Sequence, residues 1–176
     1  MRTVVRAIDS LSGYAGGLAK WFCYALILII VYDVTMRYLF SAPTMWAFET
    51  SMMLGGSLYA LAYSYTHRLH GHVRVDVIYI RLSPRVRATI DVLGALFLFF
   101  PLLGFLIHAS FALTWRAWAI GETSDITYWY PPLAPFRTVV LLGFCLLALQ
   151  AIAQFIRDLY ALAGKELNHG LSLIHI

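Results

Sequence analysis

Residues 19–40 read AKWFCYALILIIVYDVTMRYLF, a run in which apolar residues predominate. An α-helix rises about 1.5 Å per residue, so about 20 apolar residues cross the roughly 30 Å hydrocarbon core of a bilayer. The run is long enough to cross, and its apolar core is longer than that of a cleaved signal peptide. Asp33 and Arg37 also interrupt it. We therefore expect this segment to be retained as a membrane helix.

Three further apolar segments follow, at residues 46–66, 88–116 and 133–162. Of the 176 residues, 61% are hydrophobic and only 12% are charged, whereas a soluble domain has about 25% charged residues. Four spans use most of the chain and leave no room for a soluble catalytic domain. We predict an all-α integral membrane protein with a single four-helix domain, residues 1–165, and a disordered tail, residues 166–176.

Lys and Arg residues are distributed unequally between the two sides of these predicted spans. Short loops that are rich in Lys and Arg stay in the cytoplasm. Ten of the thirteen basic residues would lie on one side: Arg2, Arg6, Lys20, Arg68, Arg74, Arg81, Arg85, Arg87, Arg157 and Lys165. We therefore predict that both termini and the loop of residues 67–87 are cytoplasmic. The formal charge of +4 is better explained by this orientation than by binding to nucleic acid.

The loop of residues 67–87 contains an alternating segment and three histidines. His72, Arg74 and Asp76 alternate with valines, and this period of two predicts a short extended segment. We expect it to lie at the membrane interface between the second and third helices. The spacing of the histidines matches no strong metal motif, so we predict no metal site there.

Prolines indicate where the predicted helices begin, turn or bend. Pro43 lies in the short connection between the first two apolar segments and disfavours a helical conformation at the residue before it. Ser83 followed by Pro84 is typical of a helix start, and Pro101 should kink the third helix. Residues 128–135 combine aromatic residues with prolines, which is typical of an aromatic belt at the membrane surface.

Ionisable residues within the membrane are costly, so each one is a candidate functional residue. Asp33 and Arg37 are four residues apart and share one face of a helix. Glu49 follows the tight connection at Pro43 and should lie near Arg37. We expect these three charged residues to neutralise one another and to lock the helical hairpin. The alternative is a cation or proton site.

Few residues suggest redox or catalytic chemistry. His108 is the only histidine inside a predicted span, whereas haem b ligation usually takes two histidines from facing helices. Cys23 and Cys145 both lie in predicted spans and are best explained as small buried hydrophobic residues. The chain has no nucleophile elbow, no glycine-rich phosphate loop and no carboxylate pair placed for acid–base catalysis. We predict neither an enzyme nor a bound cofactor.

Small and amide residues predict packing surfaces. Gly56, Ala60 and Ser64 recur at four-residue spacing, which lets two helices approach closely in lipid. Gln150 and Gln154 share one face of the last helix and could donate hydrogen bonds to a neighbour. The pattern alone does not distinguish contacts within the bundle from contacts with another subunit.

One ordered set of residues runs through the predicted spans: Arg37-Tyr38-Leu39-Phe40, Pro43, Trp46, Glu49, Gly56, Ala60, His72-Val73-Arg74-Val75-Asp76, Ser124, Gly143 and Gln150. In this order and spacing, the chain resembles the small membrane subunit of tripartite ATP-independent periplasmic (TRAP) transporters. The resemblance covers about residues 15–162.

The resemblance implies a four-helix subunit of the bacterial inner membrane that pairs with a larger membrane subunit. In that family the large subunit carries the substrate and sodium sites and moves as an elevator, and a soluble periplasmic protein captures the substrate, usually an organic acid. The small subunit would brace the large one among the membrane lipids and help to dock the periplasmic protein.

The resemblance implies structural roles for Arg37, Trp46, Glu49, His72, Arg74 and Asp76. On physical grounds the interaction residues also include Asp33, Gly56, Ala60 and Gln150.

Two other classes of protein stay open as alternatives. A membrane anchor of a respiratory enzyme would need a quinone site or a second deep histidine. A small homodimeric multidrug-type transporter would need a carboxylate at the membrane centre, but Glu49 lies near the outer end and Asp33 already has a partner.

Overall fold

The computed structural model describes residues 2–69 and 84–162, and these residues are mostly helical. The elements are α1 (Arg2–Leu39), α2 (Met45–Arg68), α4 (Pro84–Gly94), a π-helical segment η1 (Ala95–Phe99), α5 (Phe100–Ile120) and α6 (Ala134–Leu162). The described ranges contain no strand, and their one β-bridge, between Thr123 and Pro132, is isolated.

Two sequence predictions fall outside the described residues. The extended interfacial segment with His72, Arg74 and Asp76 is one, and the disordered tail at residues 166–176 is the other. Both stay predictions. The helix start predicted at Pro84 does lie within the described ranges, and α4 begins there.

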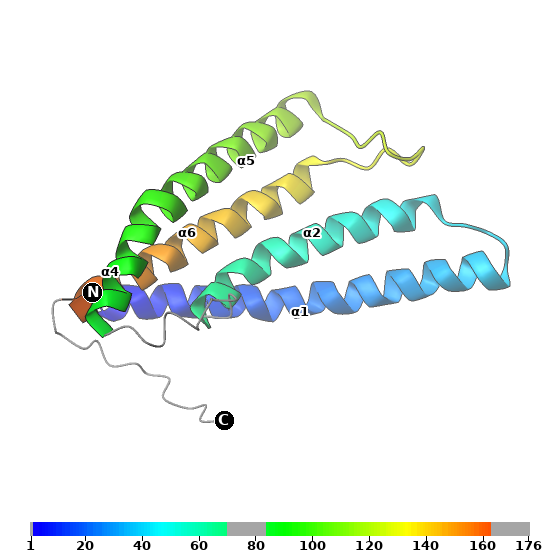
Figure 1. Ribbon diagram of the computed structural model, residues 1–176. Helices are drawn as coiled ribbons and strands as arrows, with labels where there is room; N and C mark the ends of the chain where they lie inside the picture. Colours follow the sequence, from blue (N-terminus) through cyan, green and yellow to red (C-terminus); the bar gives the residue numbers. More distant parts are fainter. Residues whose placement is uncertain (1, 70–83, 163–176) are drawn as a thin grey trace.

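The long helices lie side by side in the order α1, α2, α6, α5 (Figure 1). The start of α1, the end of α6 and α4 gather at one end of the bundle, which we call the terminal end. The α1–α2 hairpin and the loop of residues 121–133 lie at the opposite end, which we call the loop end. Helix α2 therefore occupies a central position, with α1 on one side and α6 on the other.

Within residues 2–69 and 84–162, three segments are long and apolar enough to cross a membrane: Ala7–Leu39, Val92–Ile120 and Ala134–Tyr160. Helix α2 has 24 residues, which is sufficient length, but its glycine, serine, threonine and tyrosine residues reduce its hydropathy. The prediction of an all-helical, multi-pass membrane protein is thus confirmed for three helices. The fourth span and the cytoplasmic termini stay predictions.

Two helices extend beyond the apolar segments that predicted them. Helix α1 begins at Arg2 instead of residue 19, and the third helical region begins at Pro84 instead of residue 88. Polar residues lower the hydropathy of a segment without preventing it from forming a helix. The apolar segments therefore located the most hydrophobic part of each helix and not the helix ends.

The helical interruption expected at Pro101 is present as the π-helical segment η1, which ends just before it. Proline has no N–H group, and its ring collides with the carbonyl group four residues earlier, here that of Phe97. A π-helical turn is one way in which a helix accommodates such a disruption. The ribbon changes direction between α4 and α5 in Figure 1.

Small residues bring α2 and α6 into close contact. A Cβ atom added to Gly143 on α6 would lie 2.5 Å from the carbonyl oxygen of Ala60 on α2. One added to Gly56 would lie 2.8 Å from the ring of Phe136. Ser64, on the same face of α2 as Gly56 and Ala60, is fully buried. The small residues of α2 therefore pack within this bundle, against α6.

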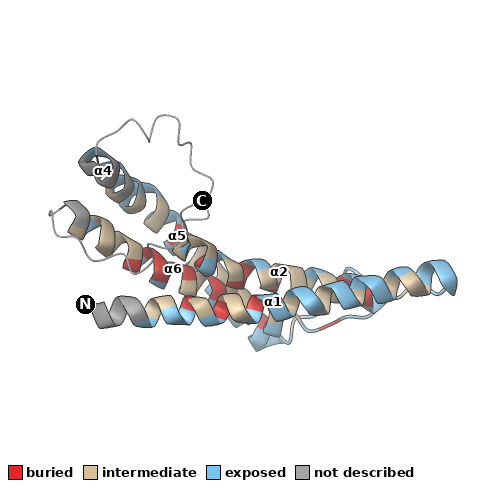
Figure 2. Ribbon diagram, turned by 90° about the horizontal axis from the view of Figure 1, so that it is seen from below, coloured by how far each residue is buried: buried red, intermediate tan, exposed pale blue. Residues whose placement is uncertain are grey.

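The outward faces of the helices are apolar and exposed. Buried residues lie mainly where α1, α2 and α6 face one another (Figure 2). In the most apolar stretch of the Val92–Ile120 segment, only 6% of the residues are buried within the bundle. In a membrane such surfaces face lipid or another membrane subunit.

Replacing Gly143 with alanine should lower the thermal stability of the protein, because the new Cβ atom would collide with the α2 backbone. Overpacking of this kind typically costs about 1–3 kcal/mol. Gly104→Ala is the matched control, since Gly104 lies in α5 with nothing within 4 Å of an added Cβ. Alanine there should gain up to about 1 kcal/mol of helix propensity. Thermal unfolding in detergent measures both, and equal melting temperatures would contradict the close α2–α6 approach.

Candidate functional site

The structure gathers polar side chains at both ends of the bundle. The terminal cluster consists of Asp9, Ser12, Arg68, Gln150 and Arg157. The loop cluster consists of Glu49, Ser124 and Thr127. Each joins segments that are far apart in the sequence.

Gln150 is the central residue of the terminal cluster and is 0% exposed. Its Oε1 atom accepts a 2.8 Å hydrogen bond from the Ser12 hydroxyl, and its Nε2 atom donates a 3.0 Å hydrogen bond to Asp9 Oδ1. Arg157 forms a 2.5 Å salt bridge with the other oxygen of Asp9. Arg68 donates a 2.8 Å hydrogen bond to the Asp9 carbonyl oxygen. The cluster therefore ties α1 to both α2 and α6.

Sequence reasoning identified Gln150 but missed its partners on α1. Asp9 and Ser12 lie before residue 19, where the first membrane segment was expected to begin. Their three-residue spacing, and the seven-residue spacing of Gln150 and Arg157, place each pair on one helix face, which is a signal that could have identified them. The contacts of Gln150 are within the bundle, which the sequence alone had left open.

Asp33 organises the α1–α2 hairpin at the loop end. It forms a 2.6 Å salt bridge with Arg37, as the spacing predicted. It also accepts hydrogen bonds from the hydroxyl and the backbone N–H of Thr44, immediately before α2. Trp46 packs against Tyr32 across the hairpin, with ring centroids 5.7 Å apart.

Glu49 does not join this hairpin, which corrects the sequence expectation. The Glu49 side chain is only 1% exposed and accepts a hydrogen bond from the Thr127 hydroxyl, in the loop between α5 and α6. Arg37 is turned toward Asp33 and remains largely exposed. The reason is the face that each residue occupies: Glu49 lies on the buried face of α2, and Arg37 lies on the exposed surface of α1.

One oxygen of Glu49 has no hydrogen-bond donor. Within the described residues, Oε2 is buried and without a partner. Ser124, which is itself buried, also interacts with this carboxylate. Glu49 is thus an incompletely satisfied carboxylate in the interior of the loop end.

The base of the loop of residues 121–133 is closed by ionic and backbone contacts. Arg137 donates two hydrogen bonds to the Glu122 carboxylate, at 2.5 and 2.8 Å. These bonds from Arg137 hold the pKa of Glu122 below its usual range. Backbone hydrogen bonds from Leu133 to Glu122 and from Ser124 to Pro131, both 2.9 Å, complete the closure. The loop is therefore a constrained element.

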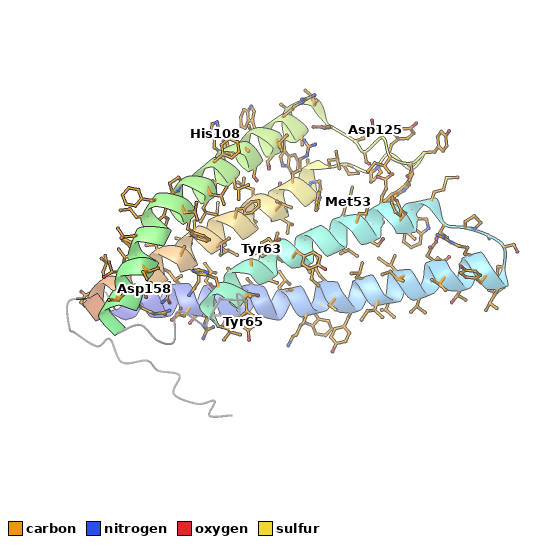
Figure 3. All side chains as sticks on the ribbon, in the orientation of Figure 1. Met53, Tyr63, Tyr65, His108, Asp125 and Asp158 are labelled. Carbon is orange, nitrogen blue, oxygen red and sulfur yellow. The ribbon has the colours of Figure 1, made fainter. Side chains whose placement is uncertain are left out.

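The histidines of the described ranges lie apart from these clusters. His108 is exposed on α5 (Figure 3), and the ring of His67 stacks on that of Phe99 at 5.5 Å. No group of three or more His, Cys, Asp or Glu residues suited to a metal ion occurs among the described residues. Cys23 is exposed and Cys145 is half-buried, and both are free thiols.

An all-helical chain with three helices able to span a bilayer has the architecture of a multi-pass membrane protein. Comparison with known families adds its identity. Residues 26–161 match the family described as tripartite ATP-independent periplasmic transporters, DctQ component. No curated protein gives a significant match. The chain belongs to the DctQ family, the small membrane component of TRAP transporters, and the resemblance found in the sequence is confirmed.

The family assignment defines a coarse function. The DctQ component is part of a membrane transport system, and such components are not enzymes. The family operates together with a large membrane subunit and a binding protein.

Replacing Gln150 with leucine should destabilise the bundle, because Ser12 and Asp9 would each lose a buried hydrogen-bond partner. Such a loss costs about 1–3 kcal/mol. Gln154→Leu is the matched control, since the side-chain hydrogen bonds of Gln154 in the described ranges are to Arg157 and Asp158 on its own helix. Melting temperatures in detergent test this. Equal destabilisation by both changes would refute the central role of Gln150.

The Glu122–Arg137 pair should make stability depend on acid pH. Because the folded-state pKa of Glu122 lies below its ordinary value of 4.5, the pair stabilises the fold above pH 4.5. That stabilisation is lost as the pH falls through the folded-state pKa. The difference in melting temperature between the wild type and Glu122→Gln should therefore be full at neutral pH and shrink in acid. A constant difference would rule out this origin.

Proposed function

We propose that this chain is the accessory small membrane subunit of a sodium-coupled, binding-protein-dependent secondary transporter that takes up organic acids. The observation that carries the proposal is the match of residues 26–161 to the DctQ family. The large subunit would carry the substrate and sodium sites and move as an elevator. This chain would brace that subunit in the bacterial inner membrane.

The charged groups of this chain suit a bracing role. In the described ranges the pairs Asp9–Arg157 and Glu122–Arg137 each hold two segments together, and Asp33–Arg37 pairs within α1. Secondary transporters commonly bind substrate where membrane helices are unwound at mid-depth. Helices α1, α2 and α6 are continuous instead. The two salt bridges between segments and the uninterrupted helices α1, α2 and α6 favour a rigid scaffold over a moving carrier.

The surface of the bundle suits a partner in the membrane. The α5 helix exposes large apolar side chains along its length, including Phe105, Phe111 and Trp115. Lipid and the large subunit would share these surfaces. We further propose that α2 is the fourth span, because it lies between α1 and α6 and is long enough to cross. The termini and the loop with His72, Arg74 and Asp76 would then be cytoplasmic.

The loop end would face the periplasm in this orientation. There, Tyr128, Trp129 and Tyr130 are exposed on the constrained loop of residues 121–133. We include contact with the periplasmic binding protein in the proposed role of this loop. Aromatic residues are enriched in protein interfaces, which supports this assignment.

Reconstitution into liposomes tests the accessory role. The arms are this chain alone, the large subunit alone, both subunits, and both subunits with the binding protein. Each is measured with an imposed sodium gradient and a labelled organic acid. Uptake should require both membrane subunits, the binding protein and the gradient, because this chain contributes the scaffold and the other components contribute the binding sites.

Three results would contradict the proposal. Uptake by this chain alone would identify it as a carrier in its own right. Full uptake by the large subunit without this chain would remove the need for a brace. A haem absorption spectrum of the purified chain would favour a respiratory anchor instead. Gly104→Ala, which adds a Cβ atom with nothing within 4 Å, serves as the control for the expression and purification of membrane variants.

A further inference from the structure

Glu49 differs from Asp9, Asp33 and Glu122 in having no arginine partner among the described residues. Asp9, Asp33 and Glu122 each form a salt bridge with an arginine. Glu49 is more deeply buried than these, yet within the described residues no basic side chain pairs with it or acts on it electrostatically. Hydrogen bonds from Thr127 and the interaction with Ser124 offset part of the cost of burying this charge, but Oε2 remains without a donor among the described residues, and no arginine among them supplies a counter-charge.

Two side-chain hydroxyl groups, whose oxygen atoms can act as metal ligands, lie beside the Glu49 carboxylate. The Thr127 hydroxyl contacts one carboxylate oxygen, and the buried Ser124 hydroxyl lies in the same cluster. The second carboxylate oxygen, Oε2, is buried and free of hydrogen-bond donors from the described residues. Carboxylate and hydroxyl oxygens are the ligands that hard inorganic cations prefer. The Glu49 carboxylate carries one negative charge, and the Ser124 and Thr127 hydroxyl groups are neutral. A cation with a single positive charge would therefore neutralise the cluster.

The loop presents these hydroxyl groups from a constrained position. The Glu122–Arg137 salt bridge closes the base of the loop, and the Ser124 N–H group donates a 2.9 Å hydrogen bond to the Pro131 carbonyl oxygen. Tyr130 has a positive φ of 50°, which is uncommon for a residue with a side chain. Ser124 is therefore positioned before any cation arrives, which reduces the entropic cost of binding.

The position of Glu49 on α2 does not remove the need for a counter-charge. The helix dipole exerts most of its effect within the first turn of a helix. Helix α2 begins at Met45, so Glu49 lies beyond that turn. Three arginines of the described ranges lie near the loop end. Arg37 pairs with Asp33, Arg137 pairs with Glu122, and the exposed Arg116 acts electrostatically on Glu122 and not on Glu49.

We propose that Glu49, Ser124 and Thr127 form a binding site for a small monovalent inorganic cation at the loop end. The cation supplies the charge that Glu49 lacks and joins α2 to the loop of residues 121–133. The site belongs to this chain and does not depend on the proposed role of the chain as an accessory subunit.

Infrared difference spectroscopy of the purified full chain tests this site. The buffer is exchanged between N-methyl-D-glucamine chloride and sodium, lithium or potassium chloride at equal ionic strength. At least one of the inorganic cations should shift a carboxylate stretching band saturably and raise the melting temperature, as expected for a ligand of the folded state. Glu49→Gln should abolish both effects.

Asp125→Asn is the matched control, because Asp125 is an exposed acidic residue in the same loop (Figure 3). It removes the same charge and should preserve the band shift and the rise in melting temperature. Thr127→Val and Ser124→Ala should weaken cation binding while leaving the Glu49 carboxylate in place. They keep the proposal testable if Glu49→Gln does not fold.

Four outcomes would overturn the proposal. The first is the absence of any cation-dependent band, and the second is an equal shift in the wild type and Glu49→Gln. The third is equal binding in the wild type, Thr127→Val and Ser124→Ala. The fourth is a protonated-carboxyl band at neutral pH that disappears in Glu49→Gln and does not respond to cations, which would show that a proton neutralises Glu49.

Discussion

The close approach of α2 and α6 is the constraint on which the rest of the bundle depends. The backbone of Gly143 lies so close to the carbonyl group of Ala60 that even a Cβ atom would not fit between them. Lipid chains are as apolar as the helix surfaces, so helix association in a membrane relies on tight packing and on hydrogen bonds between helices. The α2–α6 contact provides the packing. It also places α2 at the centre, so that α1 and α5 are positioned by the two helices that they flank.

Polar contacts then determine how the remaining segments join this pair. At the terminal end, Asp9 accepts hydrogen bonds from Gln150, Arg157 and Arg68, so one residue of α1 is bonded to both central helices. At the loop end, Glu122 and Arg137 hold the loop of residues 121–133 to the start of α6. Packing in the middle and polar contacts at the ends give a scaffold whose outer faces remain apolar.

The sequence predicted well those features that depend on local pattern. Helical spacing predicted the Asp33–Arg37 salt bridge and the packing of Gly56 and Ala60, and Pro101 predicted the interruption in the third helical region. Pairings between distant segments were not predictable. Glu49 is close to Arg37 in sequence, but the rotation of α2 directs it toward Thr127, which is 78 residues away.

The helix ends show the same limitation for a different reason. The apolar run that predicted α1 begins at residue 19 and so left out Asp9 and Ser12, although the segment of α1 that is apolar enough to cross a membrane, Ala7–Leu39, includes both. These residues are nevertheless helical, and their polar groups are satisfied by Gln150. A polar residue near a predicted span can thus belong to the same helix when a distant partner satisfies it.

Asp9 and Glu122 differ from Glu49 in how their charge is compensated, and this difference has a mechanical consequence. Where an arginine of the same chain supplies the counter-charge, as for Asp9 and Glu122, the contact persists as long as the fold does. Glu49 has no such partner among the described residues, so in the proposed site a bound cation would strengthen its contact with Thr127. The loop of residues 121–133 would then combine a base fixed by Arg137 with an attachment to α2 that responds to its ionic surroundings. A subunit that acts as a scaffold could in this way keep its membrane helices rigid while the exposed face of this loop changes.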